Sequence, residues 1–230
     1  VKNHYLVVYF CIAKLYISKK IMNFKNKLEE IKKGFEATKE YVLHPIAALF
    51  SSKKITNNTE LTQYIRNQSA KVTQQTLYEY VRTRMGTLYV KMHDNEKFIE
   101  SLNIAKWNIY TVALQDLSLF AHSIIENKYH KDFTNLELEN FYKNILDLEV
   151  SQGLKQDLLE EKIKEFHLRL QDTDLKSFFQ NKPFKNSSLA LYYWAPIADE
   201  LKQQDRNIVL NSIHLKWKNV EKEFSKLLDF

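Results

Sequence analysis

The chain has 230 residues, of which only three are glycine and three are proline, and 44% are hydrophobic. Average usage would give roughly sixteen glycines and eleven prolines. Because strand-rich folds use these residues in tight turns, the composition predicts an all-α fold with a substantial core and disfavours glycine-rich phosphate loops and nucleophile elbows. The net charge of +6 lies in residues 1–54, which carry eleven lysines against four glutamates and leave −1 for the rest. With only five arginines in the chain, nucleic acid is disfavoured as a partner.

The first predicted segment, residues 1–21, contains a run of about thirteen mostly apolar residues that is interrupted by Lys14. A membrane-spanning helix needs roughly twenty apolar residues, and no small-residue cleavage site follows the run. Met22 opens a more ordinary N-terminal sequence. We therefore expect residues 1–21 to be a dispensable extension, and the alternative is a weak membrane anchor. The single cysteine, Cys11, excludes a disulfide within one chain.

Residues 22–50 are predicted to contain a basic amphipathic helix that ends at the His44–Pro45 pair. The apolar positions step at helical spacing, and lysines occupy much of the remaining surface. Two interpretations stay open: the apolar stripe docks on the core of the protein, or the helix lies on an anionic membrane surface. The candidate membrane-surface residues are Phe24, Lys25, Lys27, Leu28, Ile31, Lys32, Lys33 and Phe35.

Residues 55–230 are predicted to form one helical domain. A first helix covers residues 60–85 and ends at Gly86, and its apolar face shifts partway, so it is either buried on two sides or broken near residues 73–76. Asp94 or Asn95 caps the next helix, which runs to about Asn127. This helix is apolar on two sides, so we expect it to be central.

Thr134 and Glu137 form a capping-box pattern that predicts a helix through about Val150. Gly153 separates it from a charged amphipathic helix over residues 154–170. Residues 171–188 are irregular by pattern, and Ser187 or Ser188 is expected to cap a short helix over 189–194. Pro196 suits the first turn of a long C-terminal helix. The sequence thus predicts an irregular bundle of about six to eight helices.

Several stretches of this chain resemble an uncharacterised bacterial all-helical family. The resemblance covers roughly residues 22–230, and it implies an all-helical fold that begins near Met22 but no activity, ligand or site residue. It rests on Gln75–Tyr78, Arg82–Gly86, Phe98–Phe120 and Ala195–Leu201.

The usual catalytic and cofactor motifs are missing from the sequence, including G-x-S-x-G, Walker A, G-x-G-x-x-G, H-E-x-x-H and C-x-x-C. The E-x-x-H pairs of di-iron bundles are also missing. His122 and Glu126 are one turn apart, but two ligands are too few for a metal, and we expect them on the surface near a helix end. We predict neither a metal site nor a cofactor.

Asp116 does not fit its surroundings, because it lies in the main apolar stripe of the predicted central helix. A buried carboxylate must be paired, hydrogen-bonded or protonated. If the helices over 60–85 and 95–127 form a hairpin, Asp116 faces Tyr64, with Arg66 within a turn. We therefore expect an ion pair between Asp116 and Arg66, with the Tyr64 hydroxyl as the alternative partner. The site is either structural or a functional pocket.

Arg82 and Arg84 precede Gly86 and stand near three tyrosines. They are candidates for anion binding, or they close the helix end and pair with Glu96 or Glu100.

Together these patterns predict a non-catalytic binding, assembly or scaffold module with a protein partner or self-association. One alternative is a peripheral protein of an anionic membrane surface, and the other is an enzyme with its site near Asp116, Arg82 and Arg84. A cytoplasmic location is expected, with the inner face of a membrane as the alternative.

Overall fold

In the computed structural model, residues 54–230 are described. This part of the chain contains eight helices and no strand, which confirms the all-α expectation. In chain order the helices are α2 (Asn58–Met85), α3 (Leu88–Met92), α4 (Glu96–Tyr129), α5 (Asn135–Val150), α6 (Gln156–Gln171), α7 (Leu175–Phe178), α8 (Lys185–Trp194) and α9 (Asp199–Leu227).

Polar side chains cap three of the long helices, and the sequence indicated two of these caps, those of α4 and α5. The Asn57 side chain accepts from the backbone N–H of Glu60 at the start of α2, and Asn95 does the same for Phe98 in α4. Thr134 forms a complete capping box with Glu137 at the start of α5. Each cap satisfies a backbone donor that has no partner inside its helix.

The α2 helix is continuous and is buried on two sides, which decides the alternative that the sequence left open. Ile65 and Val72 lie on one side and Leu77 and Val81 on the other, and all four are at most 2% exposed. The two apolar faces therefore reflect two packing partners: α2 packs against α4 and also against α9.

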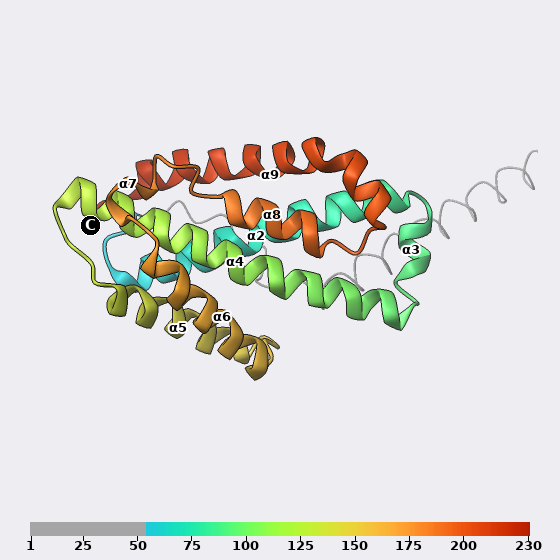
Figure 1. The fold of residues 1–230 in the computed structure, drawn as a ribbon, viewed down its shortest axis with the longest axis horizontal. Helices are drawn as coiled ribbons and strands as arrows, with labels where there is room; N and C mark the ends of the chain where they lie inside the picture. Colours follow the sequence, from blue (N-terminus) through green and yellow to red (C-terminus); the bar gives the residue numbers. More distant parts are fainter. Residues whose placement is uncertain (1–53) are drawn as a thin grey trace, which may run out of the picture.

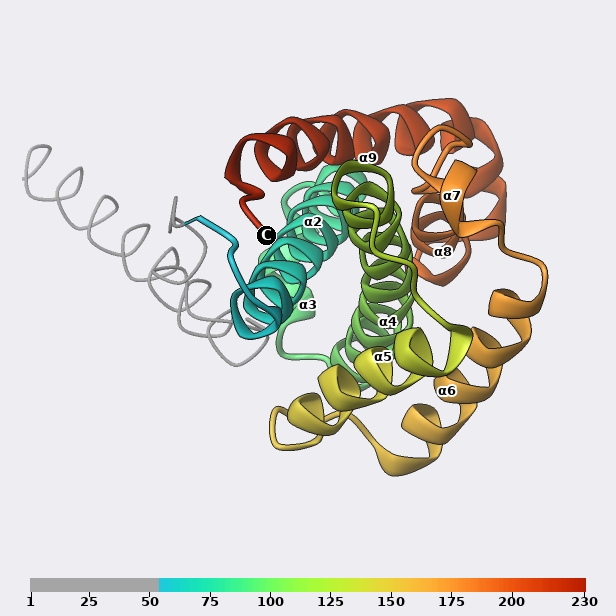
Figure 2. The ribbon, with the colours of Figure 1, turned by 90° about the vertical axis from the view of Figure 1, so that its left-hand side faces the viewer.

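The α4 helix is the centre of the fold, as its apolar character on several sides predicted. It packs against α2, α5, α7 and α8, and these helices surround it in the view along its axis (Figure 2). The α5–α6 pair lies on one side of α4, and the α8–α9 pair lies on the other (Figure 1). The middle of α4 is therefore buried, including its polar residues.

Two helix starts differ from the sequence-based expectation. The α8 helix begins at Lys185, before Ser187 and Ser188. Neither serine has to cap it, because the carboxylate of Asp116 in α4 accepts the backbone N–H of Ser187 in the first turn of α8. The α9 helix begins at Asp199, so Pro196 lies outside it in the preceding connection. A short helix, α7, also forms within the segment that was read as irregular.

The beginning of the described chain and its C-terminus are held together. The N–H of Ile55 donates to the carbonyl of Leu227, and the N–H of Asp229 donates to the carbonyl of Ile55, both at 2.9 Å. Ile55 and Leu228 thereby form an isolated parallel bridge. Among residues 54–230, no helix combines the length and apolar content that crossing a membrane requires.

Candidate functional site

Asp116 is fully buried in the middle of α4 and bound by two other helices. Its Oδ1 lies 2.5 Å from Nη2 of Arg169 in α6, and its Oδ2 accepts the backbone N–H of Ser187 in α8 at 2.7 Å. Burial raises the pKa of the Asp116 carboxyl, and both partners act in the opposite direction. The expectation that Asp116 is buried and paired is confirmed.

The partner of Asp116 is not the one that the hairpin argument indicated. Arg66 contacts Glu149 of α5 instead, with Nε 2.7 Å from Oε1. The Tyr64 hydroxyl donates to the carbonyl of Val220 in α9. Asp116 points toward α6 and α8 rather than toward α2. The expected register between α2 and α4 therefore could not identify its partner. The proposed cluster of Asp116, Arg66 and Tyr64 does not form.

The site of Asp116 is closed to ligands. A cavity of about 340 Å³ lies beside Arg169, between the end of α6 and the start of α8, and Asp116 does not line it. The Arg169 side chain separates the carboxylate from this cavity and is only 16% exposed. The arrangement supports a structural role, in which one carboxylate joins α4, α6 and the first turn of α8.

Arg82 and Arg84 do not form a shared anion site. The Arg84 guanidinium makes a two-pronged ion pair with Asp205 of α9, and the Tyr80 hydroxyl donates to the same carboxylate. Arg82 is exposed and takes no part in that pair. Neither Glu96 nor Glu100 is the partner of Arg84, so that part of the expectation is wrong. The cluster fastens the end of α2 to α9.

His122 and Glu126 are buried, which contradicts the expectation of surface placement. The His122 ring lies edge-on to Phe133 and Phe141 at 4.7 Å, and its Nδ1 lies 2.8 Å from the carbonyl oxygen of Ser118. Burial lowers the pKa of His122 to about 4. The chain after α4 folds back and covers this face. In residues 54–230 no group of three metal-ligating side chains occurs.

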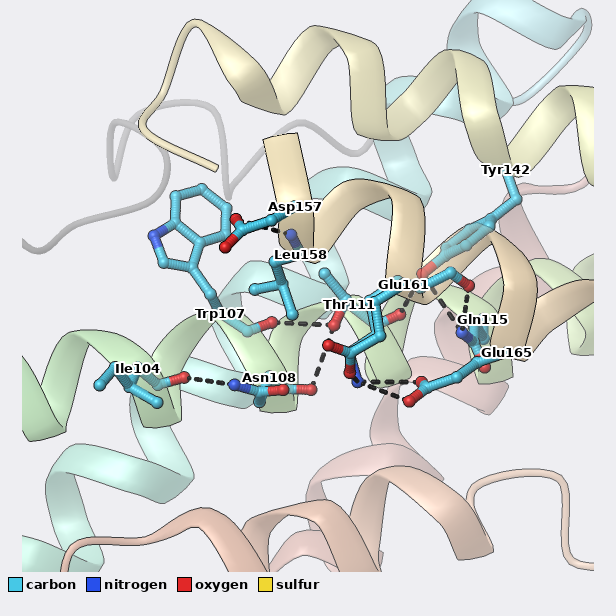
Figure 3. Close-up of polar contacts among 11 residues, drawn as sticks. Ile104, Trp107, Asn108, Thr111, Gln115, Tyr142, Asp157, Leu158, Glu161 and Glu165 are labelled. Carbon is cyan, nitrogen blue, oxygen red and sulfur yellow. Dashed lines mark hydrogen bonds and ion pairs between the residues drawn. The ribbon is translucent and has the colours of Figure 1, made fainter. Parts of the chain in front are cut away.

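A polar seam joins α4 to the α5–α6 pair (Figure 3). Tyr142 of α5 donates to the carbonyl of Thr111 at 3.1 Å, and Gln115 donates to the Tyr142 hydroxyl at 3.3 Å. Arg169 donates to Gln115 at 3.3 Å, so the seam continues to the Asp116 ion pair. The Lys162 ammonium is held by Glu161 and Glu165. These contacts fix the orientation of the α5–α6 pair on α4.

The surface feature with the clearest binding character is an apolar stripe on α9. Leu201, Ile208 and Leu215 are 36%, 71% and 62% exposed, and they recur every seven residues. We call these three residues the α9 outer stripe. They lie on a different face of α9 from Val209 and Ile213, which pack into the core. The α9 helix runs along the outside of the fold (Figure 2).

The predicted membrane-surface residues, from Phe24 to Phe35, lie outside the described residues, as do the expectations for residues 1–21 and for the helix over 22–50.

Comparisons of the chain with protein-family models, curated proteins and solved structures give no significant match.

Sequence reasoning missed Arg169 as a partner of Asp116 and did not identify the α9 outer stripe. The seven-residue spacing of the stripe is visible in the sequence. The apolar positions Val209, Ile213 and Trp217 form a stronger pattern in the same helix, and the sequence-based prediction rested on that pattern. Arg169 had no such signal, because only the docking of α6 on α4 brings it to Asp116.

Proposed function

We propose that this protein is a non-catalytic assembly module that self-associates through the α9 outer stripe. The observation that carries the proposal is the seven-residue spacing of Leu201, Ile208 and Leu215 on an exposed helix face. The contact seam between paired helices has apolar residues every 3.5 residues on average, and the α9 outer stripe supplies every second position of such a seam. The stripe spans fifteen residues, and its first and last residues are about 21 Å apart along the helix axis. This length suits a helix-to-helix contact rather than a small ligand.

Charge favours a second copy of the same chain, in antiparallel orientation, as the occupant. The α9 helix begins with Asp199 and Glu200, and its second half carries Lys216 and Lys218. Within the chain Asp199 pairs with Lys202 and Lys216 pairs with Glu79, so Glu200 and Lys218 are the charges that a second copy would meet. When two copies pair about Ile208, Leu201 of one copy meets Leu215 of the other. Glu200 of each helix then lies beside Lys218 of its partner. Antiparallel pairing also opposes the two helix dipoles favourably.

The polar residues between the apolar positions limit the strength of this contact. Gln204 and Asn211 occupy the intervening positions of the same face, and both are exposed. Polar residues in a helical seam specify register at a cost in stability. We therefore expect a reversible, concentration-dependent dimer in which the charges select the antiparallel arrangement.

Sedimentation velocity of the full chain over a range of concentrations tests the proposal. The wild type is expected to shift from monomer to dimer as its concentration rises, and Ile208→Lys is expected to stay monomeric. Leu168→Lys is the matched control, because Leu168 is 62% exposed on α6, away from the stripe. A wild type that is monomeric throughout, or equal effects of the two substitutions, contradicts the proposal.

The charge pairing has its own test in the same measurement. Glu200→Lys is expected to weaken the dimer, and the added substitution Lys218→Glu is expected to restore it. If the wild type remains monomeric and a different protein binds α9, the stripe is a binding surface for that protein and the self-association proposal is wrong. A parallel dimer would leave the charge swap without effect.

A further inference from the structure

A cavity lies at the end of the fold where α3 leads into α4. Its volume is about 630 Å³, and it is bounded by the turn after α3, the first three turns of α4 and the connection between α5 and α6. The α5–α6 connection contributes Gln152 and Gly153. This cavity is separate from the α9 outer stripe, so what it binds is independent of the proposed assembly.

Lys106 lines this cavity and is only 6% exposed. Within residues 54–230 its Nζ has no carboxylate partner, and its one specific contact is with the Trp107 ring, whose centroid lies 4.8 Å away. Burial lowers the pKa of Lys106 to about 8. Because a buried ammonium is costly unless it is paired, Lys106 is a cation that lacks its anion.

His93 adds a second group without a partner to the same cavity. In the described part of the chain neither ring nitrogen of His93 has a hydrogen-bond partner, although both atoms are buried. The ring is held between Tyr89 and Phe98. A neutral imidazole offers one donor and one acceptor. His93 and Lys106 therefore both line the cavity and both have hydrogen-bonding capacity that the described part of the chain does not use. Buried polar groups without a partner call for an explanation, and a bound ligand would supply one.

The remaining walls restrict the class of ligand. Ile99 and Trp107 give the cavity apolar surface, and Glu96 and Glu100 stand at its outer end. Glu100 and Lys106 are six residues apart on α4, or about 9 Å along the helix axis. A polyanion such as a nucleotide would meet these glutamates unfavourably. The cavity suits one anionic group near Lys106 and a positive group near the glutamates.

We infer that this cavity binds a small carboxylate whose opposite end carries an amino group. The carboxylate accepts from the Lys106 ammonium, the carbon chain lies against Ile99 and Trp107, and the amino group faces Glu96 and Glu100. Charge-assisted hydrogen bonds of this type are the strong ones in proteins. The two ends together select a zwitterion over a simple fatty acid or a simple amine.

Proton uptake gives a signature that is specific to Lys106. A bound carboxylate favours the protonated lysine and so raises its pKa. Near pH 8, where about half of the free sites carry a neutral amine, binding takes up about half a proton. The other titratable groups of the lining are His93, Asp94, Glu96 and Glu100, and the α5–α6 connection contributes none.

The experiment is isothermal titration calorimetry of the full chain with 6-aminohexanoate, hexanoate and hexylamine. At pH 8, in two buffers of different ionisation enthalpy, 6-aminohexanoate is expected to bind with proton uptake. Lys106→Met is expected to lower its affinity at least about tenfold and to abolish the uptake. Lys97→Met is the matched control, because Lys97 is exposed on the same helix and does not line the cavity.

The preference for 6-aminohexanoate over hexanoate tests the assignment of the amino end. Hexanoate is expected to bind about two- to fivefold more weakly than 6-aminohexanoate, and Glu96→Gln with Glu100→Gln is expected to remove that difference. Unchanged affinity in a Lys106→Met protein with a wild-type circular dichroism spectrum overturns the inference. So does a lack of binding by all three probes at millimolar concentration. Equal binding of hexanoate and 6-aminohexanoate overturns the assignment of the amino end.

Discussion

Arg169 and Asp116 form the ion pair that connects α6 to the middle of α4, with 2.5 Å between Nη2 and Oδ1. The carboxylate is fully buried, and its second oxygen accepts the N–H of Ser187. Asp116 therefore serves two helices at once: it neutralises a cation of α6 and satisfies a first-turn donor of α8, where the helix dipole favours negative charge.

Replacement of Asp116 by alanine is expected to lower the free energy of unfolding by about 3–5 kcal/mol, because it leaves Arg169 charged and mostly buried. Chemical denaturation measures this loss. The combined replacement Asp116→Leu with Arg169→Met is expected to recover much of it, since no unpaired charge remains. Lys97→Ala is the control and is expected to change stability by less than about 0.5 kcal/mol. A double variant as unstable as Asp116→Ala would contradict this account.

Removal of the Asp205 carboxylate is expected to cost less, about 1–3 kcal/mol. Asp205 is buried, but the side chain of its partner Arg84 is 33% exposed and can reach water when the pair is broken. Comparison of Asp205→Ala with Asp116→Ala in the same denaturation experiment tests whether the exposure of the remaining cation sets the cost. The reverse order of the two losses would count against that explanation.

His122 predicts a specific loss of stability in mild acid. Its pKa is lowered to about 4 in the folded state, while the ordinary value is about 6.5. Between these values the unfolded chain binds more protons than the folded one, so stability falls as the pH falls. Between pH 6.5 and pH 5 the wild type is expected to lose about 1.6 kcal/mol through this group.

The matched variant for this measurement is His122→Gln, which keeps a donor for the carbonyl of Ser118 but does not titrate. It is expected to show a smaller change in the free energy of unfolding over the same pH interval. Parallel pH profiles for the two proteins would show that His122 is not the source of the effect.

Gly86 is predicted to be required for its backbone conformation alone. Its φ of 55° and ψ of −127° at the end of α2 are unfavourable for a residue with a side chain. A Cβ at this position meets nothing within 4 Å. Gly86→Ala is therefore expected to cost about 1–2 kcal/mol through strain. Thr87→Ala, at an exposed neighbour with an ordinary φ of −67°, is the control for thermal unfolding.

The sequence by itself determined the long helices of the described chain, but not the short helices α3 and α7. The small number of glycines and prolines, together with the caps at Asp94 or Asn95 and at Thr134, located the long elements because these signals act within one or two turns. The burial of Asp116 also followed from its place in an apolar stripe. The start of α8 did not follow from the sequence, because the carboxylate that accepts a first-turn N–H of α8 belongs to Asp116 in α4.

Only the tertiary structure decided which side chains meet. Arg169 reaches Asp116, and Arg66 reaches Glu149, because α5 and α6 dock on α4 across many residues of sequence. His122 is buried for a similar reason, since the chain after α4 returns over it. Local periodicity states which face of a helix is apolar, but the partner of a buried charge depends on how distant helices are placed around it.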